Sequence, residues 1–244
     1  MQPLSTRTAG FTDSVIRRMT RISNKFGAIN LSQGFPDFDP PREMTDRLAE
    51  IAHTGPHQYA ITWGAQNFRE ALARKQTRWT GIPVDADKNI VVTCGSTEAM
   101  MAAMMTIVNP GEKVAIFSPF YENYTADTIL AGAEPVYIPL VPPSFGFDAN
   151  LIEDAFKQGA KALVLCNPSN PCGKVFSRQE LEQIADLWSN TMAMSSPTRS
   201  MNILSMPHTI TSISLRCRAC GNARSRAVPC QRHTASLVGD WAMS

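Results

Sequence analysis

Short apolar strands alternate with helical segments from residue 89 to residue 188, and this alternation constrains the fold more than any other feature. The apolar runs lie at 89–94, 113–117, 135–139 and 162–166. Segments with helical spacing lie near 97–108, 122–132, 148–158 and 178–188. Alternation of this kind predicts βαβ units, and therefore an α/β fold whose mostly parallel sheet is covered by helices on both faces.

Two amphipathic helices are predicted before the first strand. The segment "TDSVIRRMTRISNKFG" has helical spacing, with Thr12 or Asp13 as the expected cap. The segment "PPREMTDRLAEIAHTG" opens on proline and closes on Gly55.

The charge of the chain differs between its two parts. The net charge is +2, yet residues 189–244 hold six arginines against one acid, Asp240, whereas the first 188 residues carry 20 acidic and 17 basic side chains. A hydrophobic content of 43% and a charged content of 18% are typical of a globular protein rather than a disordered one. The two compositions indicate that the chain changes character near residue 188.

Neither a membrane segment nor an extracellular framework is indicated. No apolar run approaches the roughly 18 residues that cross a bilayer, and the amino end lacks the apolar core of a signal peptide. Three cysteines are scattered in the first part and three cluster after residue 216, which is no disulfide framework. We therefore expect a cytoplasmic protein with no membrane partner.

Ligands of parallel sheets bind at the carboxyl ends of the strands, so the residues after each strand matter most. After the first strand comes "GSTEAMM", residues 95–101. Ser96 and Thr97, opening a helix behind a glycine, would offer backbone N–H groups and a positive dipole end to a phosphate. The same residues also fit an ordinary helix start, with Ser96 or Thr97 as the cap and Glu98 in the first turn.

Two further strand ends carry polar or aromatic residues. After the strand at 113–117 comes "SPFYENY", whose Phe120, Tyr121 and Tyr124 could face a ring or pack in the core. After the strand at 162–166 comes "NPSNPCGKVF", a tight turn in which an asparagine side chain could donate a hydrogen bond to a ligand oxygen. Each motif alone also fits a plain turn.

Taken in order, these motifs resemble consecutive signatures of the class I/II aminotransferases, the fold-type-I enzymes that depend on pyridoxal 5'-phosphate. The resemblance covers about residues 5–188, and its style is closest to the methionine and kynurenine aminotransferases. The segments that carry it are "INLSQGFPDFDPP", "HQYAITWGAQNFREALA", "VVTCGSTEAM", "GEKVAIFSPFYENY" and "NPSNPCGKVFS".

The resemblance assigns roles to matching positions. It implies that Ser96 and Thr97 bind the cofactor phosphate, that Tyr121 stacks on the pyridine ring, and that Asn170 bonds the phenolic oxygen. It further implies that Gly34 contacts the substrate carboxylate. Tyr59 would reach the cofactor of a neighbouring subunit, which implies a homodimer whose substrates are an amino acid and a 2-oxo acid.

Four groups that this chemistry needs are expected after the "NPxGK" turn. They are the Schiff-base lysine, an acid for the pyridine nitrogen, a tyrosine for the phenolic oxygen and an arginine for the substrate carboxylate. In the family, the first two lie in segments like "TDEVYEH" and "SLSKTYSITGWRLGY", and nothing similar follows Trp188. The residues after 188 show no helical or strand period and no capping pattern.

A shifted reading frame accounts for this tail. If the last base of each codon is joined to the first two of the next, some junctions are forced, such as Met192 with Ala193 to glycine and Met201 with Asn202 to glutamate. Filling the free bases, residues 190–207 can be read as "YDGYVVTDEVYEHIVYA" and residues 227–243 as "SSLSKTYSITGWRLGY". We therefore infer a frameshift close to Trp188 and Ser189, with the missing lysine encoded across Gln231 and Arg232.

The frameshift also explains an apparent zinc motif in the tail. Cys217, Cys220, Cys230 and His233 have a spacing that loosely resembles zinc knuckles. Because they fall within the out-of-frame text, we expect no metal site, and a zinc or nucleic-acid-binding tail ranks last. The basic balance of the tail keeps that alternative open.

The predicted domain organisation follows from these points. Residues 1–40 are predicted to form an N-terminal arm and part of the small domain, residues 41–188 a partial large domain for pyridoxal phosphate, and residues 189–244 an out-of-frame tail that is no domain. The carboxyl-terminal small domain is expected to be absent and the sheet to be incomplete, with an unpaired strand edge that favours aggregation. The predicted function is that of an aminotransferase whose present chain is inactive; a noncatalytic fragment that binds the cofactor or interferes with a dimer is the alternative.

Overall fold

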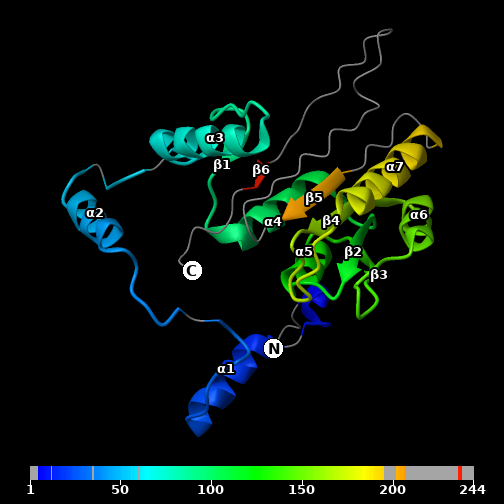
Figure 1. The fold of residues 1–244 in the computed structure, drawn as a ribbon, viewed down its shortest axis with the longest axis horizontal. Coiled ribbons are helices and arrows are strands. Elements are labelled where there is room, and N and C mark those ends of the chain that lie inside the picture. Colours follow the sequence, from blue (N-terminus) through cyan, green and yellow to red (C-terminus); the bar gives the residue numbers. More distant parts are fainter. Residues whose placement is uncertain are drawn as a thin grey trace.

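The computed structural model describes residues 5–11, 13–34, 36–55, 57–59, 61–194, 202–206 and 236–237. The described chain begins with helices only, and strands and helices alternate from residue 90 to residue 206 (Figure 1). The helices are η1 (Thr6–Thr8), α1 (Val15–Phe26), α2 (Arg42–Ala52), α3 (Gln66–Thr80), α4 (Gly95–Ile107), α5 (Asn123–Leu130), α6 (Ala149–Lys157) and α7 (Arg178–Met194). The strands are β1 (Ile90–Val91), β2 (Lys113–Ser118), β3 (Glu134–Pro139), β4 (Ala160–Cys166), β5 (Asn202–Met206) and β6 (Ser236–Leu237).

A four-stranded sheet forms the centre of the fold, with the strand order β3-β2-β4-β5. All three pairings are parallel. Ala115 of β2 lies opposite Val136 of β3 and Leu163 of β4, which places β2 and β4 side by side in the interior of the sheet. The predicted α/β fold with a mostly parallel sheet is confirmed.

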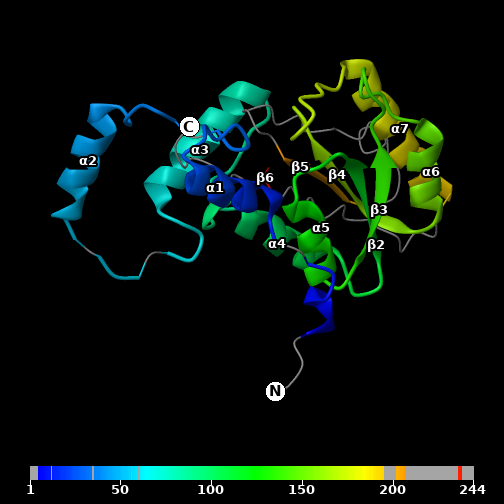
Figure 2. The same cartoon turned by 90° about the horizontal axis from the view of Figure 1, so that it is seen from below.

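Side chains of the central strands alternate between two separate cores. In β2, Val114 and Ile116 pack against α4 and α5, whereas Ala115 and Phe117 pack toward α6 and α7. This alternation is the pleat of a strand that is buried on both faces. Helices therefore cover both faces of the sheet, as the sequence predicts (Figure 2).

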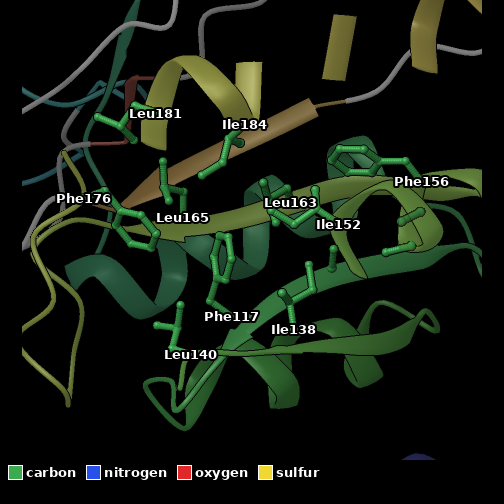
Figure 3. Close-up of a cluster of buried hydrophobic side chains, with 13 residues drawn as sticks. Phe117, Ile138, Leu140, Ile152, Phe156, Leu163, Leu165, Phe176, Leu181 and Ile184 are labelled. Atoms are coloured by element: carbon green, nitrogen blue, oxygen red, sulfur yellow. The ribbon is translucent and has the colours of Figure 1, made fainter. Parts of the chain in front are cut away.

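The core beneath α6 and α7 is closed by large apolar side chains (Figure 3). The Phe156 ring is 1% exposed and lies edge-on to Trp188 of α7, with ring centroids 5.4 Å apart. Phe117 and Phe176 lie 5.3 Å apart between β2 and the segment after β4. These contacts hold α7 and the preceding turn against the sheet.

The first strand does not join this sheet. β1 has only two residues and pairs in parallel with β6, as a separate two-stranded sheet. The predicted strand over 89–94 is therefore shorter than expected, and it lies outside the four-stranded sheet. No strand of the four-stranded sheet pairs with β1. Its backbone N–H and C=O groups are instead paired with β6, which is distant in sequence.

The tail also departs from expectation. Residues 202–206, in the segment where no strand was predicted, form β5, which pairs with β4 from Ala162↔Asn202 to Cys166↔Met206. In the strand order of the described residues, β3 and β5 are the edge strands. The exposed edge of an apolar strand is a template for any extended segment that reaches it. In addition, α7 continues past Trp188 to Met194.

The two N-terminal helices form close to where they are predicted, with different ends. Ser14 caps α1 by accepting a hydrogen bond from the Arg17 N–H, so neither Thr12 nor Asp13 is the cap. α2 ends at Ala52 rather than Gly55. Figure 1 shows both helices projecting away from the sheet. Among the described helices, none has the length and apolar character required to cross a membrane.

Candidate active site

The carboxyl ends of β2 and β4 bring two of the predicted motifs to one edge of the sheet. β2 ends at Ser118 and β4 ends at Cys166, and Ile116 lies opposite Val164 in the parallel register between them. The segment 118–124 and the turn 167–176 therefore start side by side. This edge is where ligands of open parallel sheets bind.

The first turn of α4 carries Ser96 and Thr97. The helix cap is Cys94, which makes no side-chain capping bond, so the interpretation of Ser96 or Thr97 as the cap is wrong. Glu98 lies in the first turn as expected, and its carboxylate accepts the N–H of Cys94. Both hydroxyl residues lie inside the positive end of the helix dipole, where an anion is stabilised.

A hydrogen bond joins this helix start to the segment after β2. The side-chain amide Nδ2 of Asn123 donates to Oγ1 of Thr97 over 2.8 Å. Tyr121 lies two residues before Asn123. The start of α4, with its predicted phosphate-binding residues, and the ring predicted to stack on the cofactor therefore lie at the same edge of the sheet. Sequence reasoning missed Asn123; its place between a strand end and a helix start was the available signal.

The three aromatic side chains after β2 have different roles. Tyr121 is half-buried and lies edge-on to Tyr124, with centroids 5.8 Å apart. Tyr124 is 4% exposed, and burial raises the pKa of its phenol, helped by Cys166, Tyr121 and Asp127. Phe120 stacks on Tyr137 at 5.2 Å. Tyr124 is thus a core residue, whereas Tyr121 stays partly open at the edge of the sheet.

The turn after β4 is held by its own hydrogen bonds. The Ser169 N–H donates to the Lys174 carbonyl over 2.8 Å, and the Gly173 N–H donates to the Ser169 carbonyl over 2.7 Å. The buried Asn167 side chain accepts the Phe176 N–H over 3.0 Å and so serves the turn itself. Asn170 is half-buried in the same turn.

Gly34 and Tyr59 lie apart from this edge. Gly34 is exposed in the segment between α1 and α2, and a Cβ built on it would meet no atom within 4 Å. Tyr59 is 97% exposed and has a positive φ of 49°. In the described part of the chain, no hydrogen bond connects either residue to Thr97, Tyr121 or Asn170.

Several predictions fall on residues outside the described ranges. These are the lysine encoded across Gln231 and Arg232, and the apparent zinc ligands Cys217, Cys220, Cys230 and His233. Within the described ranges, no group of three or more His, Cys, Asp or Glu side chains is placed to hold a metal ion.

The side chains at this edge fit both the phosphate and the aromatic ring of pyridoxal phosphate. Thr97 and Ser96 at an uncapped helix start suit a phosphate, because charge-assisted hydrogen bonds to N–H and O–H donors are the usual contacts of such groups. A half-buried aromatic ring and an amide side chain from the neighbouring strand end suit a polar aromatic ring.

Comparison with known proteins agrees with this chemistry. The sequence pattern of the family described as Aminotransferase class I and II matches residues 27–195. The probable N-succinyldiaminopimelate aminotransferase DapC of Mycobacterium tuberculosis is 36% identical over 183 residues, which are 74% of this chain and 46% of that protein. The methionine aminotransferase of Escherichia coli is 37% identical over 175 residues, or 72% of this chain and 45% of the relative.

Solved structures show the same fold. The N-succinyldiaminopimelate aminotransferase from Mycobacterium tuberculosis superposes with a TM-score of 0.74 at 32% identity, covering 83% of this chain and 51% of that one. Aspartate aminotransferase from Thermus thermophilus also gives a TM-score of 0.74, at 27% identity. The chain spans about half the length of the proteins it matches. The fold is thus an incomplete fold-type-I large domain, and the chain belongs to the class I and II aminotransferases, a family that depends on pyridoxal phosphate.

Proposed function

We propose that the protein of this gene, read in one continuous frame, is an aminotransferase that moves an amino group from an amino acid to a 2-oxo acid. The observation that carries the proposal is the shared edge at which the uncapped start of α4 is hydrogen-bonded through Asn123 to the segment of Tyr121. Relatives named as methionine and kynurenine aminotransferases support methionine-, aromatic- or kynurenine-type donors.

The residues at this edge have distinct tasks in the proposal. Ser96 and Thr97 bind the phosphate, Tyr121 stacks on the pyridine ring, and Asn170 donates to the phenolic oxygen. Gly34 contacts the substrate carboxylate from the arm that follows α1. When bound, pyridoxal phosphate supplies the electron sink for the reaction, while these side chains fix its orientation.

The chain as written does not complete this reaction in our proposal. It contains no lysine after Lys174, so no side chain is available at the position of the family's covalent attachment. Two observations support the shift of reading frame close to Trp188 and Ser189: the forced junctions in the tail, and the family match that stops at residue 195. The 244-residue chain is thus a noncatalytic, cofactor-binding form of a cytoplasmic enzyme.

The proposed assembly of the complete enzyme is a homodimer. Tyr59, in the segment before α3, supports it, because a tyrosine side chain that is 97% exposed is available to a second subunit. Sedimentation of the frame-restored protein tests whether it is a dimer. The variant Tyr59→Ala should still dimerise, but a titration with the cofactor should show weaker binding.

Two proteins prepared side by side test the catalytic proposal. One is the 244-residue chain, and the other is encoded by the gene with the frame restored after codon 188, both made in a host that lacks its own transaminases. We expect transamination of methionine or kynurenine with a 2-oxo acid only from the restored protein, with the cofactor covalently attached after borohydride reduction. Turnover by the 244-residue chain, or inactivity of a folded restored protein, would contradict the proposal.

Binding is tested on the 244-residue chain itself. Pyridoxamine phosphate is the suitable ligand because it has no aldehyde to react with surface lysines. Tyr121→Ala should weaken its binding roughly tenfold, the contribution expected of one ring stacking contact. Trp79→Ala, which removes an aromatic side chain that is 59% exposed on α3, serves as the matched control and should bind normally.

A further inference from the structure

We propose that Asn123 is a positioning residue for the phosphate group, acting through the hydroxyl of Thr97. This inference rests on the proposed function, because it concerns the same site. The starting observation is the 2.8 Å hydrogen bond in which Nδ2 of Asn123 donates to Oγ1 of Thr97.

The direction of this hydrogen bond decides what the Thr97 hydroxyl can do. A threonine hydroxyl has one proton to donate and two lone pairs that accept. When a lone pair accepts from Asn123, the hydroxyl proton must point away from the amide. A hydroxyl that is already accepting a hydrogen bond is also a stronger donor to the next group. Asn123 therefore prepares Thr97 to donate to an anion.

The position of Thr97 favours the binding of an anion. Thr97 lies in the first turn of α4, where the helix dipole is positive and the cap residue, Cys94, makes no side-chain capping bond. The same turn holds the carboxylate of Glu98, which would repel a phosphate. That carboxylate is turned back to accept the Cys94 N–H. The Glu98 carboxylate thus occupies the N–H of the cap residue, and the hydroxyl directed by Asn123 is a separate donor in the same first turn.

The support beneath Asn123 keeps its amide in place. Asn123 is the first residue of α5, and the next residue, Tyr124, is 4% exposed in the core under α4 and α5. On the other side, Glu122 accepts a hydrogen bond from the Ser14 hydroxyl over 2.8 Å. The start of α5 is therefore fixed both in the core and against the cap of α1.

A double-mutant cycle on the 244-residue chain tests the proposal. The variants are Asn123→Ala, Thr97→Val and the pair together, and the ligands are pyridoxamine phosphate and pyridoxamine, which lacks the phosphate. Asn123→Ala should weaken binding of pyridoxamine phosphate roughly three- to tenfold, as expected for the loss of one neutral hydrogen bond, the one that orients the Thr97 hydroxyl. Binding of pyridoxamine should be unchanged.

The cycle also asks whether Asn123 acts through Thr97. In the Thr97→Val background, adding Asn123→Ala should have no further effect. Asn150→Ala is the matched control, since Asn150 is an exposed asparagine at the start of α6 whose amide bonds Asp148. Far-ultraviolet circular dichroism of each variant shows whether it keeps the fold.

The outcomes separate this inference from the proposed function. If the wild-type chain binds pyridoxamine phosphate and Asn123→Ala binds it equally well, or weakens both ligands alike, Asn123 has no role toward the phosphate. The same conclusion follows if the effects of Asn123→Ala and Thr97→Val are additive. If the wild-type chain binds neither ligand, the proposed function of the site fails, and this inference fails with it.

Discussion

Lys174 and Glu180 form an ion pair that fastens the turn carrying Asn170 to the first turn of α7. The Lys174 ammonium lies 2.6 Å from Oε1 of Glu180, and the two side chains are only 11% and 25% exposed. The same carboxylate accepts the Ser177 N–H over 2.7 Å, while the Ser177 hydroxyl accepts the Glu180 N–H. This is a reciprocal capping box at the start of a helix.

Removing the Glu180 charge should destabilise the fold. Glu180→Gln leaves the Lys174 ammonium partly buried without its partner, and we expect a loss of about 1–3 kcal/mol in the free energy of unfolding. Urea denaturation followed by circular dichroism measures it. Glu182→Gln on the same helix is the control, because its carboxylate is 63% exposed and 4.0 Å from Arg178, and should cost about 0.5 kcal/mol or less.

The pH dependence of that difference follows from the pKa of Glu180. Burial opposes ionisation, but the hydrogen bonds from Lys174 and Ser177 outweigh it and lower the pKa below its ordinary 4.5. A lowered carboxyl pKa stabilises the folded state above pH 4.5, and that stabilisation is lost as the pH falls through the folded pKa. The difference in the free energy of unfolding between wild type and Glu180→Gln should therefore be largest at pH 7 and should shrink as the pH falls below 4.5. A gap that widens in acid would contradict the assignment.

Asp127 should produce the opposite pH dependence. Burial raises its pKa from 3.8 to about 6, and within the described ranges its Oδ2 atom has no hydrogen-bond partner. The folded state therefore holds a proton that the unfolded chain releases, so the free energy of unfolding falls as the pH rises from about 4 to 6. The size of this fall is roughly 1–3 kcal/mol.

The variant Asp127→Asn isolates this effect. The difference in unfolding free energy between Asp127→Asn and wild type should grow in favour of the variant from pH 4 to pH 6.5 and then stay constant. Asp154→Asn, at an exposed aspartate on α6, is the control for the exchange of a carboxylate for an amide. A pH-independent difference for Asp127→Asn would show that folding does not raise the pKa of Asp127.

Phe156 is predicted to be a major contributor to the core under α6 and α7. Its side chain is 1% exposed and packs edge-on against Trp188. Phe156→Ala should lower the free energy of unfolding by about 3–5 kcal/mol, because it removes buried surface and leaves a cavity. Leu151→Ala, on the same helix with a side chain 41% exposed, should cost far less. Equal losses in the two variants would show that α6 is not packed as described.

Gly64 is the glycine whose replacement should be most costly. Its φ of +96° is rare for other residues, and an added Cβ would overlap the side chain of Val92. The Gly64 carbonyl also accepts a hydrogen bond from the buried Arg69, which links α3 to this turn. Gly64→Ala should lower the melting temperature, whereas Gly10→Ala, with open space around it, should leave it nearly unchanged.

Local sequence patterns were sufficient for most of the sheet and its helices. The strands predicted at 113–117, 135–139 and 162–166 are found as β2, β3 and β4, because runs of buried apolar residues between helices leave few other arrangements. α3 was missed, since its start at Gln66 has no side-chain cap and it was noted only as part of a family signature. The end of α2 was placed late because a proline and a glycine mark its flanks only approximately.

The candidate site, like the fold, was predicted in part from the sequence and in part needed the tertiary structure. The sequence alone determined which segments follow each strand, and so which residues are the candidates proposed for the site: Ser96, Thr97, Tyr121 and Asn170. Only the tertiary structure decided that Cys94 is the cap of α4, that β1 pairs with β6 and β4 with β5, and that Asn123 bonds Thr97. Strand partners and contacts between helices depend on segments far apart in the chain, whereas propensity and periodicity report only on neighbours along it.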